Sequence, residues 1–305
     1  MPAVSHPEFS HTAFVYSSDA EYVEAAVDFL RTGLEAGHGA LVSAPRDRQA
    51  LVRRGLGSVS EEVGFLDLAG VADRPARTLA AQYAALHERL RHWPAMRLFV
   101  GVEPGPPHNG WPDWLGYEAA LDRALAAMPV WALCGYDARR APAPLLETIL
   151  RGSPELLAGA RPSGSGADRA EILGEPTPPL RPLPELRTVA DGEDPEALRV
   201  QLAAALAAQG VGGSRAMETV LAANEAILNA FRHAEPPVEV RLGRVGDRVV
   251  CEVVDQGPGF DDPLIGFDPP GDPAGRAPGM WVVRQLVRNL EAFPTAAGFT
   301  VRLWL

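Results

Sequence analysis

The sequence predicts two domains, an α/β domain with a parallel sheet followed by an α+β domain. The chain has 305 residues, which suits two domains of about 100–200 residues each. Residues 159–184 are rich in Pro, Gly and Ser, which is a linker composition. Strand and helix patterns alternate before this stretch and are grouped after it. We therefore expect domains over residues 1–155 and 186–305, joined by a linker over residues 156–185.

The front half contains short apolar segments typical of buried strands, separated by amphipathic segments typical of helices. The expected strands are His11–Ser17, Gly39–Ser43, Val63–Leu68, Met96–Val102 and Pro129–Tyr136. The expected helices are Asp19–Ala36, Asp47–Arg54, Thr78–His92 and Trp114–Ala127. Repeated alternation of this kind indicates a parallel sheet with helical crossovers.

The back half has a different order of elements. The expected strands are Leu186–Ala190, Val238–Val245, Arg248–Asp255 and Phe299–Leu305. The expected helices are Pro195–Gln209, Ser214–His233 and Pro278–Leu290, with a loop over Gly257–Gly279. Gly246-Asp247 between two β-rich segments is typical of a hairpin, so we expect helices packed on one face of an antiparallel sheet.

Composition excludes several classes of function. The net charge of −11 argues against a nucleic-acid surface, because phosphate binding requires clustered cations. All 28 basic residues are Arg, which excludes a Walker-A lysine and Schiff-base chemistry. The cysteines, Cys134 and Cys251, are far apart in sequence, which fits a reducing cytoplasm rather than a disulfide framework. With no signal peptide and no long apolar segment, we expect no membrane association.

Three polar or glycine-rich motifs follow one another in the back half. Glu225, Asn229 and His233 form a stripe at helical spacing, which a solvated helix face would explain equally well. Residues 255–260 read D-Q-G-P-G-F at the end of a predicted strand, where glycines permit close backbone approach. Residues 275–280 read G-R-A-P-G-M directly before a predicted helix, whose N-terminal N–H groups can face a phosphate.

Taken together and in this order, the three motifs resemble those of the GHKL ATPase family, which includes histidine kinases, type II topoisomerase subunits and Hsp90 chaperones. The resemblance covers Leu186–Leu305. It implies the α+β sandwich known as the Bergerat fold, and it implies ATP and Mg²⁺ as cofactors.

The resemblance also implies individual roles. Glu225 would act as a general base or orient the attacking hydroxyl, Asn229 would ligate Mg²⁺, and Asp255 would accept a hydrogen bond from the adenine amino group. The other positions it assigns to nucleotide binding are Gly257, Gly259, Gly275, Gly279 and Thr300.

Within that family, the segment MWVVRQLVRNLE resembles a helix of the anti-sigma-factor serine kinases. These proteins phosphorylate Ser or Thr on an anti-anti-sigma partner, so the resemblance implies a STAS-type protein as partner. It also allows a sigma factor as a second partner and a homodimeric state. Pro278 departs from the usual second glycine motif and removes a backbone donor, which bears on catalytic rate more than on nucleotide binding.

Two alternatives stay open at this point. A domain that binds ATP and holds a partner without phosphoryl transfer would also fit the motifs and the presence of Pro278. A sensor histidine kinase would use His87, since residues 87–94 superficially resemble a phosphoacceptor box. That segment lies in the front half, far from the kinase-like motifs.

Four segments of the front half, H-T-A-F-V-Y, L-V-S-A-P, F-V-G-V-E-P and C-G-Y-D, resemble the MEDS sensory domain over His6–Leu150. That family is related to RecA-like folds and is thought to sense small organic molecules. Residues 43–46 lack the Gly-rich turn and Lys of a phosphate loop, so no ATP hydrolysis is expected here. We expect a ligand pocket where polar groups converge at one edge of the sheet. Its candidate residues are His11, Tyr16, Glu103, Cys134, Tyr136 and Asp137.

The sequence thus predicts a cytoplasmic signalling regulator that acts on transcription. A small-molecule sensory domain would control an ATP-binding serine/threonine kinase domain of the anti-sigma-factor type.

Overall fold

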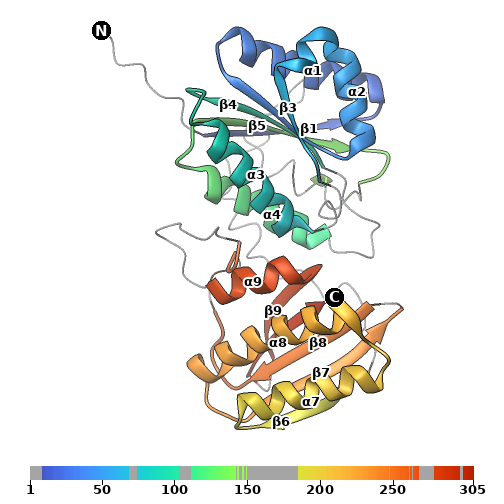
Figure 1. Cartoon of the computed structure of the whole chain (residues 1–305), viewed down its shortest axis with the longest axis vertical. Coiled ribbons are helices and arrows are strands. Elements are labelled where there is room, and N and C mark those ends of the chain that lie inside the picture. The colour runs from blue at the N-terminus through green and yellow to red at the C-terminus, as the bar shows by residue number, and fades with distance from the viewer. Residues whose placement is uncertain are drawn as a thin grey trace. The chain divides into compact units, whose positions relative to one another are not determined.

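The computed structural model divides the chain into two compact units, Met1–Glu175 and Pro176–Leu305, which are described separately (Figure 1). It describes residues 9–68, 74–102, 111–141, 143, 146, 147, 149, 185–246, 248–260, 262, 264–267, 278–295 and 298–305. The predicted linker therefore lies outside the described residues, apart from Glu185. No helix in these ranges is long and apolar enough to cross a membrane.

The front unit is built on a five-stranded parallel sheet with the order β1-β5-β4-β2-β3. Its strands are β1 Ser10–Tyr16, β2 Gly39–Ser43, β3 Val63–Leu66, β4 Met96–Val102 and β5 Val130–Asp137. Parallel strands need crossover connections, and each of the four connections from β1 to β5 contains a helix. The predicted parallel α/β class is confirmed for this unit.

Helices cover both faces of this sheet, with α1 and α2 on one side and α3 and α4 on the other (Figure 1). Their bounds are α1 Asp19–Glu35, α2 Arg46–Leu56, α3 Pro75–Arg89 and α4 Trp111–Leu125, with a short 3₁₀ helix, η1, over Gly57–Glu61. Tyr22 of α1 packs with Phe14 and Phe99 on the first face. On the second face, Gln82 of α3 donates a 2.8 Å hydrogen bond to Ser43 Oγ. Alternating side chains of each strand thus meet different helices.

The back unit contains a five-stranded antiparallel sheet with the order β6-β7-β8-β10-β9. Its elements are β6 Arg187–Gly192, α7 Pro195–Ala208, α8 Gly213–His233, β7 Val238–Val245, β8 Arg248–Asp255, α9 Pro278–Leu286, β9 Asn289–Thr295 and β10 Gly298–Trp304. The three helices pack on one face, where Leu202, Ile227 and Met280 join Val253 and Val301 in one core. The predicted α+β sandwich is confirmed.

One predicted element of the back unit is wrong at its C-terminal end. The helix expected over Pro278–Leu290 ends at Leu286, and residues Asn289–Thr295 form the edge strand β9. The Arg288 N–H donates a 2.8 Å hydrogen bond to the Trp304 carbonyl, which draws the chain into the sheet. Edge position also suits Pro294, which has no N–H to donate. Tertiary pairing therefore overrides the continuous apolar pattern.

The face of this sheet that lies away from the helices carries a row of opposite charges. Arg241, Glu252, Arg302 and Glu291 occupy directly opposed positions on β7, β8, β10 and β9. Arg302 Nε lies 2.8 Å from Glu252 Oε1, and Arg302 Nη1 lies 2.8 Å from Glu291 Oε2. Arg241 Nη1 lies 3.7 Å from Glu252 Oε2. We call these four residues the charge ladder. Charge pairing of this kind offsets the cost of burying Glu252 and Arg302.

Two arginines surround the buried Asp137 carboxylate at the carboxyl end of β5 in the front unit. Arg139 Nη2 lies 2.7 Å and Arg48 Nη2 lies 3.4 Å from Asp137 Oδ2. Both arginines also contact Asp19 Oδ1 in the first turn of α1. Hydrogen bonds from Arg139 hold the pKa of the Asp137 carboxyl below its usual range. The network therefore joins the end of β5 to the first turns of α1 and α2.

Replacing Asp137 with Asn should lower the free energy of unfolding by about 1–3 kcal/mol at neutral pH, because buried Arg48 loses a carboxylate partner. Since the folded-state pKa of Asp137 is lowered, its stabilisation is present above the unfolded value of 3.8. It is lost as the pH falls through the folded pKa. Denaturant unfolding measured at several pH values tests both statements.

The matched control is Asp67→Asn, because Asp67 pairs with Arg46 while both side chains are exposed. Exposed pairs contribute about 0–1 kcal/mol, so this variant should unfold almost like the wild type. Equal losses in the two variants would contradict a special role for Asp137.

Candidate functional site

Helix α8 brings Glu225 and Asn229 to the edge of the back-unit core. Its buried face is composed of Thr219, Ala222, Ala223, Ala226, Ile227 and Ala230. Glu225 and Asn229 are half-buried beside this face and lie one helical turn apart, so they point to the same side. His233, the third member of the predicted stripe, is exposed at the end of the helix. The stripe therefore divides into a partly enclosed pair and a solvated residue.

The Glu225 carboxylate lies against the backbone of Gly279 at the start of α9. A Cβ atom placed on Gly279 would lie 2.5 Å from Glu225 Oε2, closer than real Cβ contacts. Glycine therefore makes room for the carboxylate. Pro278 is the first residue of α9, a position where the missing N–H of proline breaks no helical hydrogen bond. The structure thus joins two of the three predicted motifs. Gly275 lies outside the described residues.

Asp255 ends β8 and has one carboxylate oxygen held by its own turn. The Gly257 N–H donates a 2.7 Å hydrogen bond to Asp255 Oδ1. Oδ2 makes no hydrogen bond to any residue that the structure describes. Burial raises the pKa of Asp255 above its usual range, while the Gly257 hydrogen bond acts in the opposite direction. A half-buried carboxylate of this kind can accept a hydrogen bond from the polar edge of a ligand.

The glycines after Asp255 allow close packing around it. A Cβ atom on Gly257 would lie 2.7 Å from Ala234 Cβ, just beyond the end of α8. Gly259 has a positive φ of 77° and lies against the Phe299 ring, so a side chain would be both strained and obstructed. Phe260 also meets Phe299, with ring centroids 4.9 Å apart. The D-x-G-x-G motif thus forms a tight turn over β10.

The structure does not bring Thr300 to the Asp255 side of the sheet, which corrects its assignment to an adenine pocket. Phe299 is the residue directly opposite Asp255, and Thr300 is opposite Val254. Phe299 and Val301 belong to the core under the helices, so alternation turns Thr300 to the other face. Phe299, and not Thr300, is therefore the residue of β10 that shares a face with Asp255.

A short segment between the two glycine motifs packs on α9. A Cβ atom on Gly266 would lie 2.5 Å from the Met280 carbonyl oxygen. Arg284 Nε donates a 2.6 Å hydrogen bond to the Ile265 carbonyl, and its guanidinium lies 4.0 Å from the Phe267 ring centroid. Sequence reasoning treated this segment as loop and missed Gly266 and Arg284. Its composition, L-I-G-F, already indicated a buried segment with a close backbone contact.

Two family models match the chain. The model described as MEthanogen/methylotroph, DcmR Sensory domain (MEDS) matches residues 10–152. The model described as histidine kinase-like ATPase domain matches residues 188–305. The chain is a MEDS domain fused to a histidine kinase-like ATPase domain. Both resemblances drawn from the motifs are confirmed. No curated protein matches the chain.

The geometry of the ATPase domain fits the nucleotide that its family implies. Glu225 offers a carboxylate oxygen beside the backbone of Gly279, and Asn229 offers an amide oxygen one turn later on the same side of α8. Oxygen atoms of this kind suit a phosphate group with Mg²⁺. Asp255, in the D-x-G-x-G motif at the end of β8, offers a carboxylate oxygen that suits the adenine amino group. The family implies ATP binding, and the residue-by-residue roles stay predictions.

The six residues expected to form a sensory pocket in the MEDS domain do not converge at one edge. Tyr136 and Asp137 do end a parallel strand, but His11 lies near the amino end of β1. Asp137 is occupied by the arginine network, and Tyr16 packs on Tyr22 of α1. Glu103 lies outside the described residues. The expected pocket is therefore divided between the two faces of the sheet.

The remaining three, His11, Cys134 and Tyr136, meet under α4. His11 Nε2 lies 3.1 Å from Cys134 Sγ, and the Tyr136 hydroxyl donates a hydrogen bond to Glu118. Asp122 also contacts the His11 ring. Sequence reasoning missed Glu118 and Asp122, although two carboxylates four residues apart on a predicted helix share one face.

Asp255→Asn should weaken Mg-ATP binding by about 1–3 kcal/mol, because the amide NH₂ cannot accept the hydrogen bond that the carboxylate accepts. The same variant should be more stable than the wild type at neutral pH. A folded-state pKa raised above 3.8 means that ionised Asp255 costs stability as the pH rises through the folded pKa. Calorimetric titration and denaturant unfolding measure the two effects.

The control is Asp191→Asn in β6, an exposed carboxylate in the same domain. It should change neither ATP affinity nor stability. Unchanged ATP affinity in Asp255→Asn would remove Asp255 from the binding site.

Proposed function

We propose that the chain is a regulated protein serine/threonine kinase of the anti-sigma-factor type. The ATPase domain would transfer the γ-phosphoryl group of ATP to a hydroxyl on a STAS-type anti-anti-sigma protein. One observation carries this proposal: the Glu225 carboxylate lies against Gly279, at the backbone start of α9. A carboxylate beside a phosphate-facing helix start is suited to activating a hydroxyl that attacks phosphorus.

In this reaction the hydroxyl oxygen of the partner bonds to the γ-phosphorus, the bond to the β–γ bridging oxygen breaks, and ADP leaves. Glu225 takes up the hydroxyl proton, while Asn229 helps to hold Mg²⁺. N–H groups in the first turn of α9 stabilise the negative charge of the phosphates. Asp255 holds the adenine and thereby aligns the nucleotide. Positioning and charge stabilisation account for most of the rate in phosphoryl transfer.

In this proposal the MEDS domain regulates the kinase domain, since its family is described as sensory. A small organic ligand would bind one arrangement of the chain more tightly and thereby change kinase output. A sigma factor would be a second partner of the kinase domain, and the chain would act as a homodimer in the cytoplasm, where ATP is available.

A non-catalytic nucleotide-binding module is the second candidate function. Pro278 favours it, because the first residue of α9 offers no N–H to a phosphate. A histidine kinase acting through His87 has less support. His87 is exposed near the end of α3, a helix that connects parallel strands β3 and β4 of the MEDS domain.

Glu225→Gln should slow phosphorylation of the partner about 10²–10⁴-fold, because Gln cannot take up the hydroxyl proton. ATP affinity should stay within a few-fold of wild type, since Gln preserves the shape beside Gly279. Transfer of labelled phosphate from ATP to a candidate anti-anti-sigma protein, measured under single-turnover conditions, separates the chemical step from binding.

Glu218→Gln is the matched control, because it makes the same change two turns earlier in α8, about 10 Å away. It should react at the wild-type rate. Equal rates for all three proteins would exclude Glu225 from the mechanism, and an absence of transfer with intact ATP binding would favour the non-catalytic module. Acid-labile phosphate on His87 would instead favour the histidine kinase.

Removing the MEDS domain should abolish the response of the kinase domain to small organic metabolites. In the full chain we expect an effective ligand to change ATP affinity or transfer rate about 5–150-fold, the usual range of allosteric coupling. A chain beginning at Pro184 should not respond to the same panel. If the two chains behave identically across the panel and across cell extract, the MEDS domain does not control this output.

A further inference from the structure

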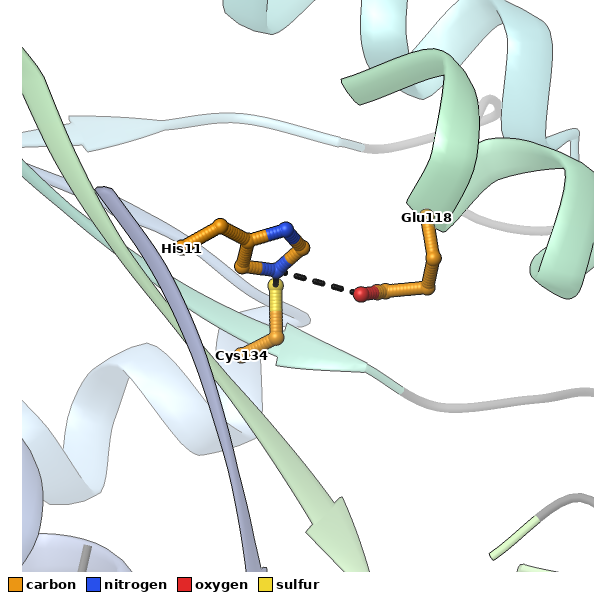
Figure 2. A group of neighbouring side chains, drawn as sticks. All are labelled: His11, Glu118 and Cys134. Atoms are coloured by element: carbon orange, nitrogen blue, oxygen red, sulfur yellow. Dashed lines mark hydrogen bonds and ion pairs between the residues drawn. The ribbon is translucent and has the colours of Figure 1, made fainter. Parts of the chain in front are cut away.

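A compact group of metal-ligating side chains lies inside the MEDS domain, which is a different domain from the one that carries the nucleotide motifs. His11 comes from β1, Cys134 from β5 and Glu118 from α4, and their polar ends meet between the sheet and the helix (Figure 2). His11 Nε2 lies 3.1 Å from Cys134 Sγ and 3.1 Å from Glu118 Oε2. All three residues are buried, and their three ligand atoms lie within 4.8 Å of one another.

Neighbouring groups orient two of these side chains toward the common point. The other ring nitrogen of His11, Nδ1, lies 2.6 Å from Asp122 Oδ1. A proton on Nδ1 would be donated to this carboxylate, which leaves the Nε2 lone pair facing Cys134 and Glu118. The Tyr136 hydroxyl donates a hydrogen bond to Glu118 Oε1 and so fixes the carboxylate while Oε2 faces His11. Histidine ligands of metals are usually held through their second nitrogen in this way.

The charges of this group also favour a cation. A neutral imidazole nitrogen, a cysteine sulfur and a carboxylate oxygen are all electron-pair donors, here gathered where water is largely excluded. A divalent cation bound to one thiolate and one carboxylate gives zero net charge, which offsets the cost of burying the separate anions.

We propose that His11 Nε2, Cys134 Sγ and Glu118 Oε2 bind one Zn²⁺ ion and leave its fourth coordination position open. Zn²⁺ accepts nitrogen, sulfur and oxygen ligands in tetrahedral geometry, whereas Mg²⁺ and Ca²⁺ prefer oxygen alone. Bonds of about 2.0–2.3 Å place tetrahedral ligand atoms roughly 3.3–3.7 Å apart. The 3.1 Å separations therefore need to open by only a few tenths of an ångström.

Binding converts the Cys134 thiol to a thiolate, and its proton is released to solvent. The open position would hold water or a donor atom of a small ligand. This site is independent of the proposed kinase activity, because none of its residues belongs to the ATPase domain. Loss of one proposal therefore leaves the other unaffected.

The test uses the full chain without an affinity tag, stripped of metal with a chelator. Zn²⁺ is titrated in competition with a colorimetric chelator, and Co²⁺ serves as a spectroscopic substitute. We expect one metal ion per chain, a thiolate-to-Co²⁺ charge-transfer band in the near ultraviolet and the intense visible bands of tetrahedral Co²⁺. Cys134→Ser should abolish the charge-transfer band and weaken Zn²⁺ binding at least 100-fold.

Cys251→Ser is the matched control. Cys251 is the chain's other cysteine, buried in β8 of the ATPase domain, where burial raises its pKa to about 12. This variant should keep the wild-type cobalt spectrum and Zn²⁺ affinity. Asp122→Asn should keep the charge-transfer band but weaken Zn²⁺ binding about 10–100-fold, because Asp122 orients a ligand without being one.

Two results would overturn the proposal. The first is a wild-type chain that binds neither ion, or that binds Co²⁺ without a thiolate charge-transfer band. The second is wild-type Zn²⁺ affinity in the Cys134→Ser variant. If Cys134→Ser fails to fold by circular dichroism, Glu118→Gln takes its place. Zn²⁺ affinity in that variant equal to that of the wild type would likewise reject the site.

Discussion

The small side chains on the buried face of α8 set the spacing on which the ATPase site depends. Ala222, Ala223 and Ala226 let the helix lie close to the sheet and to α9. That closeness brings the Glu225 carboxylate against the backbone of Gly279, where a Cβ atom would lie 2.5 Å from Glu225 Oε2. Larger residues on this face would push the helices apart, because protein cores are packed too tightly to absorb added volume. The Glu225 carboxylate is thus positioned by apolar packing.

Local sequence patterns predicted most elements of the chain, because strands and helices here carry clear periodicities and turn residues. Gly39–Ser43, Val238–Val245 and Arg248–Asp255 have the predicted bounds. The strand Asn289–Thr295 could not be predicted, since the apolar residues before it continue smoothly from α9. This strand forms because it pairs with β10, and a local sequence pattern does not reveal pairing between two segments. The D-x-G-x-G turn was predictable because glycine is required by its close contacts.

The candidate sites differ in the same way, because one depends on local patterns and the other on contacts between distant segments. Candidate residues that lie on one helix or in one turn, such as Glu225 and Asp255, could be found from the order of the motifs and their resemblance to a known family. The group of His11, Cys134 and Glu118 could not be predicted from the sequence. Its members come from two strands and a crossover helix, and the sequence does not determine the angle at which that helix crosses the sheet. Strand alternation also separated residues that sequence reasoning had grouped, such as Tyr16 and Cys134. Which face a residue occupies depends on the packing of the whole sheet.

The charge ladder also specifies the register in which the strands of the back unit pair. Each member meets an opposite charge on the neighbouring strand at only one alignment of β7, β8, β10 and β9. A slip of one residue would turn Glu252 or Arg302 into the apolar core and would carry Asp255 to the far side of the sheet. Mispaired sheets are therefore penalised by buried, unpaired charge. The ion pairs on one face of the sheet therefore help to fix the strand register that places Asp255 on the other face.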